Sequence, residues 1–223
     1  MFWLGIIVAG LAALVLITPL VDRWRQRILR RCLRDVCDVL NAHGIDYWCD
    51  FGTLLGCFRD GDIIRRDYDV DLCILAAERT KVAVLSKAFQ ERGYTFRDAN
   101  GTTRRVIRIS NNRTRYYVDL YHYTPDGAWL RSPYHAEDDV PAGLVGNRTA
   151  RPFLGGDIRV PGDIESLLVH RYGPDFMTPR RGDRGAAYTF SRVETFVRIL
   201  ENNCVGLWSM LRSMRGTASA ASR

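Results

Sequence analysis

The sequence predicts an α/β protein, in which a mixed β-sheet is flanked by helices and preceded by an N-terminal transmembrane helix. Three observations support this fold class. Residues 3–21 contain no charged side chain. Beyond them, short apolar segments with strand-like alternation recur between segments of helical periodicity, which is the pattern of a sheet packed against helices. In addition, 47% of the 223 residues are hydrophobic, which is enough for one domain with a substantial core.

The uncharged run from Trp3 to Val21 predicts a membrane anchor over residues 1–22. About 20 apolar residues allow an α-helix to cross a bilayer. A cleaved secretory signal is the alternative, but its basic residues precede the apolar run, whereas here they follow it. Because basic residues favour the cytoplasmic side, we expect an uncleaved single-pass anchor with the rest of the chain in the cytoplasm.

The net charge of +7 does not by itself predict nucleic-acid binding. Much of the excess comes from arginines within residues 23–34, on a juxtamembrane helix that we expect over residues 23–44. Such a cluster can contact anionic lipid headgroups. No stripe of basic and aromatic residues follows elsewhere in the chain. We therefore expect the membrane as a partner and no nucleic acid.

Six cysteines are present, none of them in a C-x-x-C pair. Their apolar surroundings predict buried free thiols, not zinc ligands or disulfides. Reduced thiols agree with a cytoplasmic domain. N-x-T triplets such as those at Asn112 and Asn147 would matter only in a lumen and are a counter-argument to this orientation.

We expect residues 45–212 to form one globular domain and residues 213–223 to form a disordered tail. We expect strands over 45–51, 68–75, 94–98, 104–110 and 115–123, with a hairpin over 153–163. We expect helices over 53–61, 78–93, 164–173 and 191–211.

Three aspartates at alternate positions, Asp67, Asp69 and Asp71, lead directly into an apolar strand. If the strand begins at Asp67, their side chains share one face about 6.5 Å apart, and they raise one another's pKa. A divalent cation removes this conflict, since Mg²⁺ usually binds one or two carboxylates together with waters and substrate phosphates. Asp119, on what we expect to be the adjacent strand, would complete a site for Mg²⁺ or Mn²⁺. The alternative is that Asp119 faces solvent on an edge strand.

Gly52 and Thr53 lie between a predicted strand and a predicted helix. Free backbone N–H groups at that point, with the Thr53 hydroxyl, can bind phosphate. Arg59, near the end of the same helix, can pair with a phosphate oxygen. An ordinary surface position for Arg59 stays open as an alternative.

The order Gly-Thr, D-x-D and a later acid resembles the nucleotidyltransferase superfamily. More narrowly, "FGTLLGCFRDGDIIRRDYDVDLCIL", "VDLY" and "VPGDIESLLVHRYGPDFMTP" resemble the LicD family, which includes phosphocholine transferases and the fukutin-related proteins. The resemblance implies a nucleotidyltransferase-like sheet. Two departures stand out: Arg65 and Arg66 replace the family's common Pro-Trp, and Tyr68 interrupts its run of acids. They leave the role of Asp67 open.

The resemblance implies a transferase of the EC 2.7 class. It would move a phospho-substituent, phosphocholine or a polyol phosphate, from a CDP-linked donor to a hydroxyl of a glycan or lipid-linked glycan, with release of CMP. The catalytic and metal-binding residues would be Asp69, Asp71 and Asp119, and the substrate-binding residues Gly52, Thr53, Arg59 and Asp67. Two alternatives stay open: a nucleotidyltransferase that releases pyrophosphate, and a non-catalytic, membrane-tethered protein.

Overall fold

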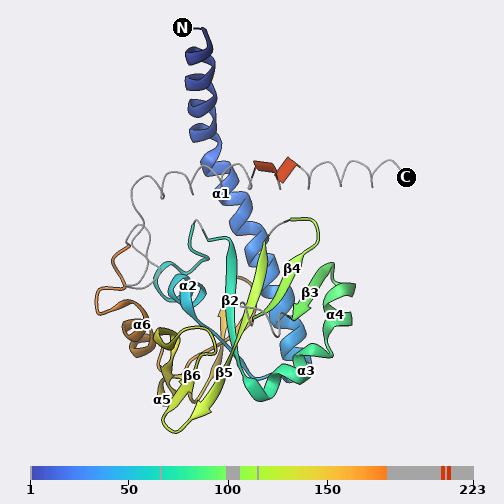
Figure 1. Ribbon diagram of the computed structural model, residues 1–223, viewed down its shortest axis with the longest axis vertical. Coiled ribbons are helices and arrows are strands. Elements are labelled where there is room, and N and C mark those ends of the chain that lie inside the picture. Colours follow the sequence, from blue (N-terminus) through green and yellow to red (C-terminus); the bar gives the residue numbers. More distant parts are fainter. Residues whose placement is uncertain are drawn as a thin grey trace.

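The computed structural model describes residues 2–65, 67–98, 106–114, 116–179, 207, 208, 210 and 211, with side chains from residue 18 onward. Figure 1 shows a long N-terminal helix leading into a domain built on one twisted sheet. Most of the helix expected over residues 191–211 lies outside the described residues, as does the tail expected over residues 213–223.

The first helix, α1 (Phe2–Ala42), is continuous through the segments expected as an anchor and as a juxtamembrane helix, with Pro19 inside it. Its later half packs against β2, β5 and β9 of the domain, because Leu29, Leu33 and Leu40 recur on one helical face and are buried. Within the described residues, none of the helices combines the length and apolar character that a membrane crossing requires. The side chains of residues 1–17, most of the expected anchor, lie outside the description.

In the described part of the chain, seven strands form one mixed sheet, which confirms the predicted α/β class. The central order is β1-β2-β5-β4-β3, and β2 pairs with β5 in parallel while the other pairs are antiparallel. The last residues of β5 pair with β6, and β6 pairs in turn with β7. The strands are β1 (Tyr47–Cys49), β2 (Asp69–Leu75), β3 (Tyr94–Asp98), β4 (Ile107–Asn111), β5 (Tyr117–Asp126), β6 (Trp129–Arg131) and β7 (Val140–Pro141).

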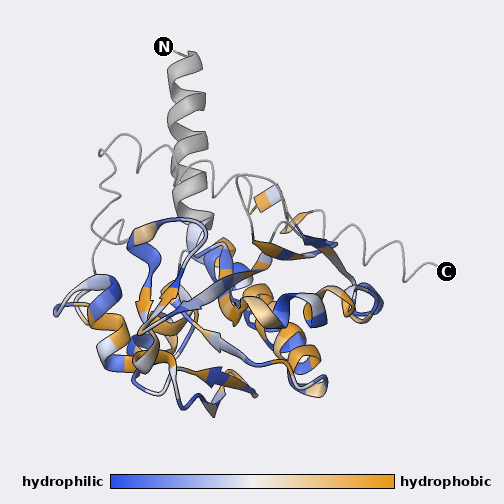
Figure 2. Ribbon diagram, turned by 60° about the horizontal axis from the view of Figure 1, so that its bottom comes forward, coloured by the Kyte–Doolittle hydropathy of each residue, from blue (hydrophilic) through white to orange (hydrophobic). Residues whose placement is uncertain are grey.

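Short helices connect these strands, and a separate hairpin packs beside α1 and β1. Figure 2 shows apolar residues distributed along both the helices and the strands of the domain. The remaining elements are α2 (Phe51–Leu55), the π-helical turn Gly56–Asp60, the 3-10 turns Ala76–Glu78 and Ala136–Asp138, α3 (Arg79–Ala83), α4 (Ser86–Glu91), α5 (Ala142–Val145), β8 (Thr149–Phe153), β9 (Gly156–Val160) and α6 (Ile164–Tyr172).

Three expectations about these elements need correction. The helix expected from Thr53 begins at Phe51, because Asp50 caps it through a 2.7 Å hydrogen bond from the Phe51 N–H. The helix expected over 78–93 is divided into α3 and α4, since the backbone leaves helical geometry at Leu85. The strand expected from Tyr68 begins one residue later, at Asp69, so Asp67 precedes β2 and is not part of it.

The cysteines that the structure describes are free thiols, as the sequence predicts. Four of these five are buried, and Cys57 is partly buried. Burial raises the pKa of Cys32 and of Cys37 to about 12. Such thiols stay protonated at neutral pH and act as small apolar side chains of the core.

Gly56 lies where the turn after α2 meets the backbone that leads toward β2. A Cβ atom at this position would lie 2.5 Å from the carbonyl oxygen of Asp62 and 3.1 Å from the backbone nitrogen of Ile64. We expect Gly56→Ala to lower the free energy of unfolding by about 1–3 kcal/mol, because neither backbone contact can yield easily. Thermal or urea unfolding measures this loss.

Gly143 supplies the matched control. It also lies in a short helix, yet a Cβ atom added there has no neighbour within 4 Å. Gly143→Ala should therefore be neutral or slightly stabilising. Equal stability of the two variants would contradict the close backbone approach at Gly56.

Candidate functional site

Two acidic residues face each other across the parallel strands β2 and β5. The register places Asp71 directly opposite Asp119. Opposed residues of neighbouring strands project to one face, and Asp69, two residues before Asp71, shares it. Val70 and Leu72 lie on the other face and are fully buried in the core. The structure thus brings Asp69, Asp71 and Asp119 to one face of two adjacent strands.

The electrostatics of this face centre on Asp71. Burial raises the pKa of Asp71 well above its usual range, and the charges of Asp69 and Asp119 raise it further. Smaller contributions come from Asp67 and Asp50. Burial also raises the pKa of Tyr121, and the nearby charges of Asp71 and Asp119 add to the effect. Negative charge is therefore concentrated at a place where water solvates it poorly.

Asp119 is buried and binds an arginine that the sequence reasoning missed. Arg108, opposite it on β4, donates from Nε to Oδ1 at 2.7 Å and from Nη2 to Oδ2 at 2.6 Å. The guanidinium also lies over the Tyr117 ring, 3.7 Å from its centroid. This bidentate ion pair neutralises the buried charge of Asp119. Nothing in the sequence distinguishes Arg108 from an ordinary outward-facing strand arginine.

The chemistry of the carboxylates fits a divalent cation, with one condition. Within the described residues, no three His, Cys, Asp or Glu side chains are placed to hold a metal ion together. Asp69 and Asp71 supply the two carboxylates that Mg²⁺ ordinarily takes from a protein, and their mutual repulsion is what a cation would relieve. The condition concerns Asp119, whose two oxygens already accept hydrogen bonds from Arg108, so a cation would have to share them with that guanidinium or displace it.

Gly52 and Thr53, predicted to bind phosphate, lie in the first turn of α2. Thr53 is buried, and its Oγ1 accepts a 2.8 Å hydrogen bond from the backbone N–H of Asp71. Thr53 therefore fastens the start of α2 to the acidic strand. A Cβ atom on Gly52 would lie 3.0 Å from Oδ2 of Asp67. The Asp67 carboxylate thus lies against the start of α2.

Arg59, the other predicted phosphate ligand, forms an ion pair with its neighbour. Its Nε and Nη2 atoms donate to Oδ1 and Oδ2 of Asp60, both at 2.9 Å. The Arg59 side chain is 11% exposed and that of Asp60 is 36% exposed, so a phosphate would have to displace Asp60 to reach the guanidinium.

A second buried ion pair, Asp50 with Arg171, adjoins the acidic face. Asp50 is fully buried, and Arg171 in the last turn of α6 donates to it from Nη2 at 2.8 Å and from Nε at 3.2 Å. Arg171 also donates to the Tyr123 hydroxyl at 3.0 Å and to the Asp138 carbonyl oxygen at 2.7 Å. The pair ties the start of α2 to α6, and the sequence reasoning did not identify it.

A mixed sheet with acids on two adjacent strands, beside a short helix that carries Gly-Thr, defines a nucleotidyltransferase-type domain. A family model described as "LicD/FKTN/FKRP, nucleotidyltransferase domain" matches residues 44–163, which is more than half of the chain. The chain belongs to the LicD family, and the resemblance predicted from its motifs is confirmed.

Two curated relatives are similar to most of this domain. Ribitol 5-phosphate transferase FKRP of Mus musculus is 34% identical over 158 residues, covering 66% of this chain and 32% of the relative. FKRP of Homo sapiens is 32% identical over 167 residues, covering 69% and 33%. This chain thus spans about a third of each relative's length. A solved structure of the antibiotic-resistance factor ANT(2'')-Ia aligns with a TM-score of 0.48 at 11% identity, covering 88% of this chain and 95% of that one.

Proposed function

We propose that the protein is a divalent-metal-dependent phosphotransferase. It moves a polyol phosphate or phosphocholine from a CDP-linked donor to a hydroxyl of a glycan or lipid-linked glycan and releases CMP. One observation carries the proposal: in a chain of the LicD family, Asp71 lies directly opposite Asp119, with Asp69 on the same face. The printed names of the relatives, ribitol 5-phosphate transferases, favour a polyol phosphate as the transferred group.

The reaction forms one bond and breaks one. The acceptor oxygen attacks the phosphorus that carries the polyol or choline, and the bond from that phosphorus to the bridging oxygen of the diphosphate breaks. Asp69 and Asp71 would hold Mg²⁺ or Mn²⁺. A bound cation would neutralise charge on the diphosphate. Asp119 accepts the proton of the acceptor hydroxyl, which requires that Arg108 first release one or both of its oxygens.

Other residues bind and orient the donor. The backbone at Gly52 and the Thr53 hydroxyl hydrogen, whose oxygen is already an acceptor for Asp71, contact a phosphate oxygen. Arg59 exchanges Asp60 for a second one. Asp67, beside Gly52, lies close enough to contribute to the same substrate-binding region.

We propose further that α1 attaches the enzyme to a membrane that carries its acceptor. Residues 1–22 form the single-pass anchor, and the domain lies in the cytoplasm. Arg23, Arg27 and Arg31 are exposed at helical spacing on α1, which suits contact with anionic headgroups. Arg25 differs, because it is buried beside Asp22 at 3.3 Å.

A donor screen tests the proposed reaction. We expect the full chain to release CMP from CDP-ribitol, CDP-glycerol or CDP-choline when a glycan acceptor and Mg²⁺ or Mn²⁺ are present, and EDTA to stop the release. CMP release is measured with each donor, and pyrophosphate release is measured with CTP in parallel. Pyrophosphate from CTP without CMP from any donor would replace phosphotransfer with nucleotidyl transfer. Failure of both assays would contradict an enzymatic function.

A further inference from the structure

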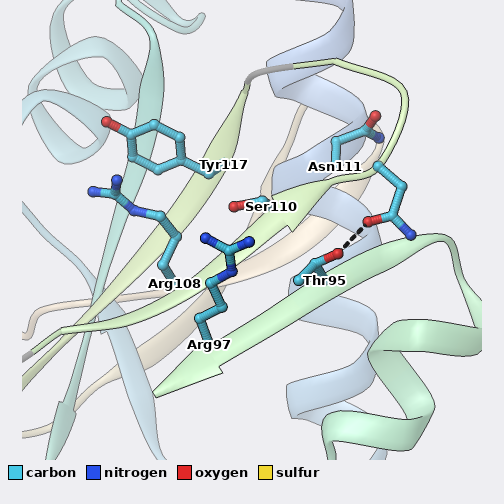
Figure 3. Close-up of a pocket in the computed structure, with 7 residues that line it drawn as sticks. Thr95, Arg97, Arg108, Ser110, Asn111 and Tyr117 are labelled. Atoms are coloured by element: carbon cyan, nitrogen blue, oxygen red, sulfur yellow. Dashed lines mark hydrogen bonds between the residues drawn. The ribbon is translucent and has the colours of Figure 1, made fainter. Parts of the chain in front are cut away.

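A polar pocket of about 850 Å³ opens on the sheet beside the acidic strands, over β3, β4 and the start of β5. Figure 3 shows side chains from these strands around it, with the guanidinium of Arg108 beside the Tyr117 ring and that of Arg97 on the neighbouring strand. The residues that matter here are Thr95, Arg97, Arg108, Ser110, Asn112 and Tyr117. We propose that this pocket binds a phosphate group of a substrate, an inference that rests on the proposed phosphotransfer.

The strand register explains how the pocket relates to the acidic residues. One row of directly opposed residues crosses four neighbouring strands and reads Asp71, Asp119, Arg108, Arg97. Two acids on β2 and β5 are thus followed by two arginines on β4 and β3. The row spans three strand spacings, about 14 Å. A ligand that lies along it meets cation-binding carboxylates at one end and guanidinium groups at the other.

The neighbouring row of opposed residues on the same four strands is also polar. It reads Asp69, Tyr117, Ser110, Thr95, and its three hydroxyl groups follow the acid toward β3. Thr95 donates to the Asn112 side-chain oxygen at 2.6 Å, which fixes that amide at the pocket wall. The pocket therefore offers hydroxyl and amide groups, the charge of Arg97 and the guanidinium of Arg108, which is paired with Asp119.

The lining supplies many hydrogen-bond donors and no carboxylate. No Asp or Glu is among the residues that form the pocket. Arg97 is exposed, and within the described residues it has no hydrogen-bond or ion-pair partner. Guanidinium groups match the paired oxygens of phosphate, so a phosphate would supply the negative charge that the wall lacks.

Arg108 connects the pocket with the acidic face. Its Nε and Nη2 atoms bind Asp119, while Nη1 makes no hydrogen bond to any described residue. A phosphate in the pocket can therefore first contact Nη1 and then compete with Asp119 for the rest of the guanidinium. Phosphate binding would in this way favour the release of Asp119 that the proposed reaction requires.

Direct binding of phosphate compounds to the full chain in EDTA tests the pocket without metal or turnover. The probes are CDP, which represents the donor, and glycerol 3-phosphate, which represents a phosphate without a nucleotide. We expect Arg97→Ala to weaken binding of at least one probe about tenfold, because it removes a charge-assisted contact. Arg151→Ala removes an arginine from the exposed part of β8, outside the pocket, and should change binding less than twofold.

The two probes distinguish the source of the phosphate. A selective loss for CDP assigns the pocket to the donor diphosphate, and a selective loss for glycerol 3-phosphate assigns it to another phosphate-bearing substrate. The proposal is wrong if wild type binds neither probe, or if Arg97→Ala binds both as tightly as wild type. Equal weakening by Arg151→Ala would also overturn it, since general charge would then explain the effect.

Failure of the pocket and failure of the proposed function give different results. Asp71→Asn should bind the probes in EDTA at least as tightly as wild type, because it removes a negative charge near the pocket. CMP release by wild type without any effect of Arg97→Ala on binding refutes the pocket alone. Binding that depends on Arg97, in a protein that releases no CMP from any donor, refutes the phosphotransferase alone.

Discussion

Replacing Asp71 with asparagine should reduce metal-dependent CMP release by about 10³-fold or more. The amide has nearly the same shape but lacks the charge with which Asp71 would hold the cation, and loss of that contact costs several kcal/mol in the transition state. Initial rates at saturating Mn²⁺ and donor measure the loss. Asp157→Asn makes the same chemical change at an exposed position of β9 and should keep wild-type activity.

The same substitution should make the metal-free protein more stable. Because burial and neighbouring carboxylates raise the pKa of Asp71 in the folded state, the folded protein binds its proton more tightly than the unfolded chain does. Stability is therefore lost as pH rises from the unfolded pKa of Asp71 through the folded one. Asp71→Asn removes this loss, so in EDTA its Tm should exceed that of wild type at pH 7 and approach it in acid.

Measuring both CMP release and Tm shows whether Asp71→Asn loses activity because the protein unfolds. A variant that is inactive and also unfolds earlier than wild type in EDTA would show that Asp71 supports the fold. Full activity of Asp71→Asn would refute its assignment as a metal ligand. Melting curves in EDTA, recorded at several pH values for wild type and variant, provide the comparison.

Replacing Arg171 with methionine should destabilise the domain by about 3–5 kcal/mol. The change keeps much of the apolar stem but leaves the carboxylate of Asp50, which is fully buried, without its counter-charge. It also removes donors to Tyr123 and to the Asp138 carbonyl oxygen. Urea unfolding of the full chain should show the loss as a lower midpoint with little change in slope.

Two further variants show whether the loss of stability in Arg171→Met comes from the unpaired charge of Asp50. Arg92→Met disrupts an exposed ion pair with Asp38, 3.7 Å long, and should cost no more than about 1 kcal/mol. Adding Asp50→Asn to Arg171→Met should restore part of the lost stability, because the buried charge disappears. A cost for Arg171→Met no larger than that of Arg92→Met would contradict a structural role for the pair.

Much of the sheet can be predicted from the sequence, because its central strands carry a clear alternation. In β2, Val70 and Leu72 alternate with Asp69 and Asp71, and this pattern alone predicts the strand and its buried face. The strands β6 and β7 and the helix α5 have too few residues to show any period. The break between α3 and α4 was also hidden, because Val82, Leu85 and Phe89 keep helical spacing and are all buried.

The site was predictable where residue type and chain order sufficed. Asp119 stands out as an acid within an aromatic and aliphatic strand, and its place opposite Asp71 follows once β2 and β5 are neighbours. The partners of the buried acids were not predictable. Arg171 lies 121 positions from Asp50, and Arg108 reaches Asp119 only because β4 joins the far side of β5. Such contacts depend on tertiary packing, which local patterns do not report.

The parallel register of β2 and β5 limits how this protein can change over evolution. A slip of one residue would turn Asp69 and Asp71 into the core and expose Val70 and Leu72, so insertions or deletions within either strand would destroy the acidic face at once. The segment just before β2 has no such register to keep. Arg65, which binds Asp22 of α1 at 3.2 Å, and Tyr68 both lie there, so this segment can change in sequence while the two strands keep their alignment.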